Sequence, residues 1–250
     1  MSEVTDAFAG HLGTRLAVHR LGSGRPVLLF HGLFSSAEVN WIKFGTAARI
    51  AEAGFECIMP DLRAHGQSEA PHDPAAYPPD VLVKDMQALV AALGLTDYDL
   101  GGFSLGARTA LGAVLAGLRP RRLVLGGMGL EGLTGWARRS AHFVDAINRF
   151  GTIKRSDPAF LAQAFMKTMK VDLAATRMLL LSVQNIAPEA VAKVTMPALV
   201  VCGVEDQDNG SAPALVEALP EGRYAEVPGT HMSSVTKPEF GEAIAGFLAG

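Results

Sequence analysis

One serine stands between two glycines in the stretch Gly102-Phe103-Ser104-Leu105-Gly106, which has the spacing G-x-S-x-G. The apolar residues before it predict a strand, and the small residues after it predict a helix. A chain that turns from strand to helix within one or two residues strains the turning residue, and glycines two positions away remove side chains that would collide there. The spacing therefore favours a nucleophilic serine at a sharp turn. A flexible glycine turn explains the same letters, so the surroundings must decide.

A histidine and several carboxylates follow two later strand-like runs. The turn Gly203-Val204-Glu205-Asp206-Gln207-Asp208 comes after one run, and Gly229-Thr230-His231 comes after the other. A serine hydroxyl is a poor nucleophile until an imidazole takes its proton. The imidazole in turn needs a carboxylate on its other nitrogen to fix its tautomer and orientation. The chain therefore holds, in order, the three residue types of a nucleophilic relay.

We assign the roles in that relay as follows. Ser104 is the expected nucleophile, His231 the general base and Asp206 the orienting acid. Asp208 is the alternative acid, and Glu205 is expected to be solvated.

The remaining sequence predicts the scaffold that brings these groups together. Seven apolar or alternating runs predict strands, at residues 15–20, 26–30, 55–60, 98–103, 122–128, 197–203 and 224–228. Runs without alternation are typical of parallel strands buried on both faces, and helical patterns separate them. We predict an α/β fold with a mainly parallel, doubly wound sheet of about eight strands. Ligands of such a sheet gather at the carboxyl ends of its strands.

Glycine thins out at residues 131–190, where helical patterns dominate and Lys and Arg outnumber Asp and Glu. We predict a helical cap at 131–190 and a core made of residues 1–130 and 191–250. The positive balance of the cap could favour an anionic substrate, but solvated surface lysines and arginines are the default explanation.

Composition narrows the classes of function. The chain has 250 residues, 49% of them hydrophobic, and a net charge of -3 with no basic run, which argues against a nucleic-acid partner. Cys57 and Cys202 lie in apolar runs, typical of reduced core thiols. No signal peptide or membrane-spanning run is apparent, so we expect a cytoplasmic protein without membrane contact.

No cofactor or metal is expected. The histidines lack helical ligand spacing, and neither a P-loop nor a dinucleotide-binding glycine motif is present. The expected partner is a small-molecule substrate, and homo-oligomerisation stays open.

Four ordered segments resemble motifs of the α/β-hydrolases. His31-Gly32-Leu33 is similar to the H-G-x oxyanion segment of that family. Asp61-Leu62-Arg63-Ala64-His65-Gly66-Gln67-Ser68 resembles its D-x-R-G-x-G-x-S loop, with Ala64 in place of glycine. The turns that hold Asp206 and His231 resemble its acid turn and its G-x-H turn.

This resemblance implies a serine carboxylesterase that forms an acyl-enzyme. It implies that the backbone amides of Leu33 and Leu105 bind the oxyanion. It also argues against haloalkane dehalogenase and epoxide hydrolase chemistry, in which the residue at the position of Ser104 is an aspartate. Phe103 stands where the family often has histidine, and this resembles some arylesterases and cofactor-free perhydrolases.

The resemblance leaves the substrate open. We expect Phe34, Phe103, Trp136 and Met232 to line the substrate pocket. Carbon–carbon bond hydrolases of dienoate ring-cleavage products are the first alternative. A protein that only binds a small ligand on the same scaffold is the second.

Five further residues are interpreted as structural. His31 precedes a glycine turn and is expected to be hydrogen-bonded rather than to carry a proton. His65, His72 and His142 are expected at the surface or in loops, and Arg108 on an exposed helix face.

Overall fold

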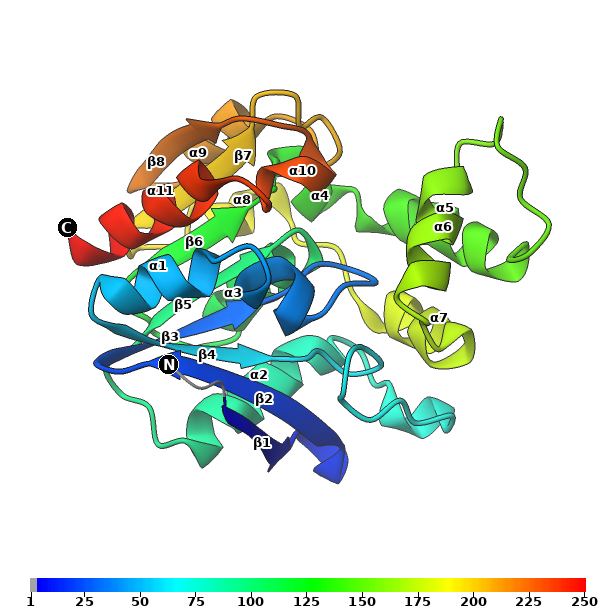
Figure 1. Cartoon of the computed structure of the whole chain (residues 1–250), viewed down its shortest axis with the longest axis horizontal. Coiled ribbons are helices and arrows are strands. Elements are labelled where there is room, and N and C mark those ends of the chain that lie inside the picture. The colour runs from blue at the N-terminus through cyan, green and yellow to red at the C-terminus, as the bar shows by residue number, and fades with distance from the viewer. Residues whose placement is uncertain (1–3) are drawn as a thin grey trace.

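The computed structural model describes residues 4–250. One mixed sheet runs in the order β1-β2-β4-β3-β5-β6-β7-β8 (Figure 1). Strand β2 is antiparallel to β1 and β4, and β3 to β8 are parallel to one another. The strands are β1 (Val4–Ala9), β2 (Arg15–Gly22), β3 (Arg25–Phe30), β4 (Phe55–Pro60), β5 (Asp99–Phe103), β6 (Leu123–Gly126), β7 (Ala198–Gly203) and β8 (Gly222–Val227).

Helices connect the parallel strands and cover the sheet. They are α1 (Thr46–Glu52), α2 (Val81–Ala92), α3 (Leu105–Leu115), α4 (Leu130–Thr134), α5 (Trp136–Asn148), α6 (Phe160–Thr168), α7 (Leu173–Ser182), α8 (Pro188–Val191), α9 (Ala212–Ala218), α10 (His231–Ser234) and α11 (Pro238–Ala249). Short helical turns lie at His11–Gly13, Glu38–Ile42 and Pro74–Ala76.

Strand β3 shows why the sheet is covered on both faces. Val27 and Leu29 belong to a core cluster shared with α1 and α11, whereas Leu28 and Phe30 belong to the cluster formed with α2 and α3. All four side chains are fully buried. Because side chains alternate across a strand, an apolar run without alternation fills a core on each side. This confirms the predicted doubly wound α/β fold.

Strand β1 is the one strand that the sequence did not predict. It pairs with the edge of β2, and the residues Asp6, Ala7 and Ala9 along it are exposed. An edge strand needs few apolar residues because its stability comes mainly from pairing with its neighbour.

The segment between β6 and β7 holds helices α4 to α8. Figure 1 shows α5, α6 and α7, coloured green to yellow, beyond the ends toward which the parallel strands point. Contacts join α5 to both α6 and α7, while α4 contacts α8 and α9. This segment coincides with the predicted cap, and its function as a cap over Ser104 stays a prediction.

A buried ion pair anchors the loop after β4. Arg63 donates to both carboxylate oxygens of Asp85 on α2, at 2.9 and 2.6 Å, and both side chains are fully buried. The guanidinium also donates to the carbonyls of Ala76 and His11. Removal of either charge would leave the other uncompensated in the interior. This network fixes the loop on which His65 lies.

Candidate active site

Ser104 occupies the turn between β5 and α3. Its backbone has φ 52° and ψ −113°, a region that L-residues rarely adopt. A Cβ on Gly102 would lie 2.2 Å from the carbonyl carbon of Gly106, and a Cβ on Gly106 would lie 2.0 Å from the carbonyl oxygen of Phe30. Only glycine fits at both positions. The two glycines thus let the chain reverse tightly enough to put Ser104 at its tip.

The side chain of His231 lies between Ser104 and Asp206. Its Nε2 is 3.1 Å from Ser104 Oγ, and its Nδ1 is 2.9 Å from Asp206 Oδ2. The three residues follow β5, β7 and β8, and the exposed fractions of the His231 and Asp206 side chains are 8% and 3%. A carboxylate at Nδ1 holds the proton on that nitrogen, which leaves Nε2 free to accept the serine proton.

The structure distinguishes between the carboxylates of this turn. Glu205 and Asp208 are exposed, and only Asp206 contacts His231. The backbone amide of Asp208 donates to Asp206 Oδ1 at 3.1 Å, so Asp208 contributes to orienting the carboxylate through its main chain.

The loop after β3 lies beside the serine. A Cβ on Gly32 would be 3.5 Å from the Cβ of Ser104. The amide of Gly32 donates to Asn40 Oδ1 at 2.8 Å, and the amide of Phe34 donates to His65 Nε2 at 3.0 Å. Between these two amides, that of Leu33 donates no hydrogen bond to any residue of 4–250.

The same holds for the amide of Leu105, the first residue of α3. Unpaired N–H groups at a helix start are suited to an anion. Their function as oxyanion donors stays a prediction.

Comparison with known proteins places this geometry in context. The family model of the alpha/beta hydrolase fold matches residues 25–123. The esterase from Exiguobacterium antarcticum has a TM-score of 0.79 at 22% identity, with 99% of this chain and 100% of that one covered. A serine hydrolase involved in carbazole degradation has a TM-score of 0.74 at 23% identity, with 99% of each chain covered. This chain has the α/β-hydrolase fold.

The relatives found by sequence match only part of this chain. An epoxide hydrolase from Caballeronia sordidicola is 37% identical over 110 residues, which are 44% of this chain and 32% of that protein. The AB hydrolase superfamily protein YisY from Bacillus subtilis is 31% identical over 96 residues, 38% of this chain and 34% of that protein. The matched segment thus spans about a third of the length of these relatives.

Two histidines of the hydrolase fold are buried and neutral. His31 donates from Nδ1 to the Gly32 carbonyl at 2.8 Å, and its Nε2 accepts from the Leu62 amide at 2.9 Å. Burial lowers the pKa of His31, as expected for a structural residue. His65 lies in the loop after β4, one of the two places expected for it, but it is not at the surface, because its side chain is buried against the His31 ring. Burial, together with His31, lowers the pKa of His65 to about 3.

The expected pocket residues lie in different surroundings. Phe34 is buried and packs edge-on against Phe143 of α5 at a centroid distance of 5.4 Å. Phe103 packs against the His231 ring at 4.9 Å. Met232 is 54% exposed.

Trp136 is buried, and its Nε1 donates to the Leu180 carbonyl at 3.2 Å. It lines a cavity of about 530 Å³ between α5 and α7, a cavity whose lining does not include Ser104. The structure thus shows what Phe103 and Trp136 pack against. The assignment of Phe34, Phe103, Trp136 and Met232 to a substrate pocket stays a prediction.

The prediction of an exposed Arg108 was also wrong. Its side chain is buried and donates to the carbonyls of Gly132, Leu133 and Gln184. The guanidinium lies 5.2 Å from the ring centroid of Trp136, and burial lowers the pKa of Arg108 to about 10. Arg108 thus joins α3 to both ends of the α4–α8 segment.

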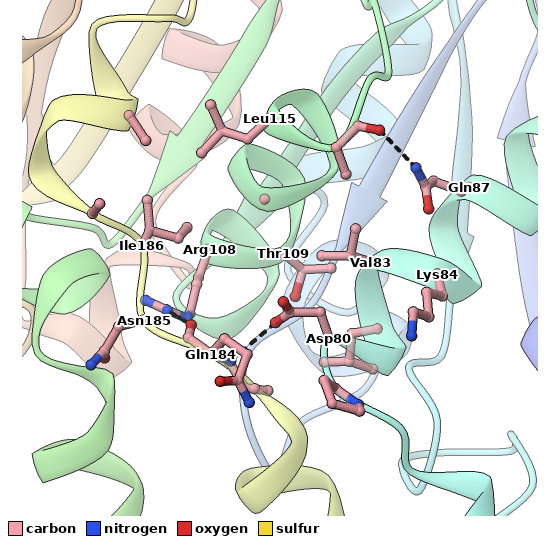
Figure 2. A pocket seen from close by; sticks show the side chains of 17 residues that line it. Asp80, Val83, Lys84, Gln87, Arg108, Thr109, Leu115, Gln184, Asn185 and Ile186 are labelled. Carbon is pink, nitrogen blue, oxygen red and sulfur yellow. Dashed lines mark hydrogen bonds between the residues drawn. The ribbon is translucent and has the colours of Figure 1, made fainter.

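Figure 2 shows Arg108 at the edge of a cavity of about 470 Å³ between α2, α3 and the stretch 183–190. The side chain of Asp80 lines this cavity, and its Oδ1 accepts a hydrogen bond from the backbone N–H of Gln184 at 3.0 Å. None of Ser104, Asp206 and His231 lines it.

Sequence reasoning missed two asparagines of the site. Asn40 holds Gly32, as described above, and Asn209 lies beside Ser104. Neither residue carries a sequence signal beyond its type, because asparagine is common in turns and at helix ends.

No group of three or more His, Cys, Asp or Glu able to hold a metal ion occurs within residues 4–250. Within the same range, no helix has the length and apolar character required to traverse a bilayer.

Proposed function

We propose that this protein is a serine hydrolase that cleaves carboxylic esters of small, largely apolar substrates. The observation that carries the proposal is the hydrogen-bonded chain from Ser104 through His231 to Asp206. The two unpaired amides beside Ser104 support it, as do the esterase and the serine hydrolase of similar fold. The contact between the buried Phe34 and the half-buried Phe143 next to the Leu33 loop favours an apolar substrate.

The reaction follows from this geometry. His231 Nε2 takes the proton of Ser104 while Oγ attacks the ester carbonyl carbon. The oxygen of the resulting tetrahedral intermediate is bound by the amides of Leu33 and Leu105. His231 then gives its proton to the departing alcohol, and an acyl-enzyme remains. Water, deprotonated by His231, attacks the acyl carbon, and Ser104 leaves with the proton restored.

Several sequence relatives are named epoxide hydrolases, and the chemistry of Ser104 argues against transfer of that activity. A carboxylate nucleophile opens an epoxide to give an ester, which water can hydrolyse. A serine oxygen would give an ether, which is inert under the same conditions. An ester substrate allows turnover with serine, and an epoxide does not.

The first test is the intact mass of the protein after exposure to a fluorophosphonate. We expect one stoichiometric adduct in the wild type and none in Ser104→Ala or His231→Ala. A folded wild-type protein that forms no adduct would contradict the proposal.

A substrate panel then defines the activity. Esters of increasing acyl length, a dienoate ring-cleavage product and an aryl epoxide are compared at equal concentration. We expect turnover of short esters. Faster turnover of the dienoate would instead support a carbon–carbon bond hydrolase, and turnover of the epoxide would refute the argument from the serine ether.

A further inference from the structure

Asn209 lies within the reach of the candidate nucleophile. It is the third residue after Asp206, and its side chain is buried. Its Nδ2 lies 2.7 Å from the carbonyl oxygen of Gly127 and 3.5 Å from Ser104 Oγ. A buried amide this close to the reacting oxygen must have a defined orientation, since burial without partners is costly.

The partners of Asn209 define that orientation. The Gly127 carbonyl can only accept a hydrogen bond, so the nitrogen of the amide rather than its oxygen must face it. The second hydrogen of the same nitrogen is then available to Ser104 Oγ. Ser104 directs its own proton at His231, which leaves the lone pairs of Oγ to accept from Asn209.

The start of the α4–α8 segment holds Asn209 in place. The Gly132 amide donates to the Asn209 carbonyl at 2.8 Å. A Cβ on Gly132 would lie 2.7 Å from the Asn209 Cβ, and a Cβ on Gly129 would lie 2.6 Å from the Asn209 carbonyl oxygen. Both positions therefore require glycine. The main chain of α4 packs so closely that the asparagine cannot shift toward it.

We propose that Asn209 is a further catalytic residue, which donates a hydrogen bond to the oxygen of Ser104. This inference rests on the proposed function. As the proton of Ser104 moves to His231, negative charge grows on Oγ, and the amide N–H stabilises it. The same bond assists deacylation, because Oγ is then the leaving group. Hydrogen bonds of this kind are often long in the free protein and shorten as charge develops.

The test is the rate at which a fluorophosphonate modifies Ser104. In this step the Oγ–P bond forms, the P–F bond breaks, fluoride leaves and His231 carries the serine proton. The rate constant at saturating reagent is measured from pH 5 to 9 for the wild type, Asn209→Ala and Asn209→Asp. Glu205→Gln, at an exposed position on the same turn, serves as the control. Asp206→Asn, in which His231 loses its carboxylate partner, shows how the pH profile changes when the acid is lost.

We expect Asn209→Ala to lower the rate constant about tenfold at every pH, less than the loss of a short oxyanion-hole bond. The apparent pKa of the profile should stay at the wild-type value, because His231 and Asp206 keep their contact. Asn209→Asp has the same shape but no N–H group at high pH, and we expect a loss at least as large. If Asn209→Ala does not fold, the rate constant of Asn209→Asp tests the contribution of the Asn209 N–H group instead. Glu205→Gln should react like the wild type.

Three results would overturn the inference. A rate in Asn209→Ala or Asn209→Asp equal to that of the wild type would exclude a contribution from the amide. A loss accompanied by the same shift of the profile as in Asp206→Asn would show that Asn209 acts only by holding the acid turn. An unreactive wild type would overturn the proposed function, and this inference with it.

Discussion

Asp206 and His231 are joined by a hydrogen bond of 2.9 Å in which the carboxylate side chain is only 3% exposed. Asp208, two residues further along the same turn, is exposed and offers its backbone amide to Asp206 instead. The turn therefore contains two aspartates with different chemical surroundings.

The replacements Asp206→Asn and Asp208→Asn together test which of the two aspartates orients His231. An amide in place of the carboxylate favours the wrong tautomer of His231, and we expect kcat for a reactive ester to fall about ten-thousand-fold. Asp208→Asn should keep kcat within about twofold, because it leaves the backbone amide in place. Steady-state ester hydrolysis measures both. Equal losses in the two variants would contradict the assignment.

The replacement Asn40→Ala tests the loop that holds Leu33. Without the Asn40 oxygen, the Gly32 amide loses its acceptor and the loop beside Ser104 loosens. We expect kcat to fall about 10- to 100-fold with little change in KM, because the oxyanion exists only during the reaction. Glu38→Ala, an exposed position on the same helical turn, is the matched control. A rise in KM alone would instead place Asn40 in ground-state binding.

The replacement Arg108→Met tests the link between α3 and the α4–α8 segment. Three carbonyls lose a buried donor at once, so we expect the free energy of unfolding to fall by about 2 to 4 kcal/mol. Urea unfolding measures this change, and hydrogen exchange should show faster opening of residues 130–190. Arg108→Lys keeps the charge but cannot reach all three carbonyls, and an intermediate loss is expected. Unchanged unfolding in Arg108→Met would refute the link.

His65 predicts a dependence of stability on pH. Its pKa of about 3 in the folded protein lies below the ordinary value of 6.5, so the unfolded chain binds more protons between these two values. The stability that comes from the neutral imidazole is fully present above pH 6.5. It is lost by about 1.4 kcal/mol per pH unit as the pH falls toward 3.

We therefore expect His65→Asn to be less stable than the wild type at pH 7 but to lose less stability between pH 6.5 and 4.5. Urea unfolding at a series of pH values gives the two slopes. Parallel slopes would mean that His65 does not remain neutral in the folded protein.

Much of the scaffold was predictable because it depends on local patterns. Apolar runs without alternation identified the parallel strands, and the order of Ser104, Asp206 and His231 along the chain indicated that they meet at one edge of the sheet. Strand β1 escaped prediction because its residues are mostly polar or small, and pairing with β2 rather than burial keeps it in place.

The misjudged residues share one physical cause. Arg108 and His65 are buried because main-chain groups far away in sequence satisfy them: the Gln184 carbonyl for Arg108 and the Phe34 amide for His65. Main-chain groups carry no signature in the amino-acid letters. Asn209 escaped notice for the same reason, since its partner at Gly127 is a carbonyl. Side-chain partners can be anticipated from residue types, whereas backbone partners require the fold.

The helical segment after β6 also helps to hold the turn 206–211, which carries Asp206. The Arg139 guanidinium contacts the Asp208 carbonyl, Gly132 binds the Asn209 carbonyl, and Glu131 accepts the Ser211 amide at 2.8 Å. Replacing this segment with that of another protein, in order to change substrate preference, would therefore also remove contacts that position the turn of Asp206. Chimaeras that keep residues 129–139 of this protein should retain kcat for ester hydrolysis. Chimaeras that replace these residues should need compensating changes in the turn 206–211.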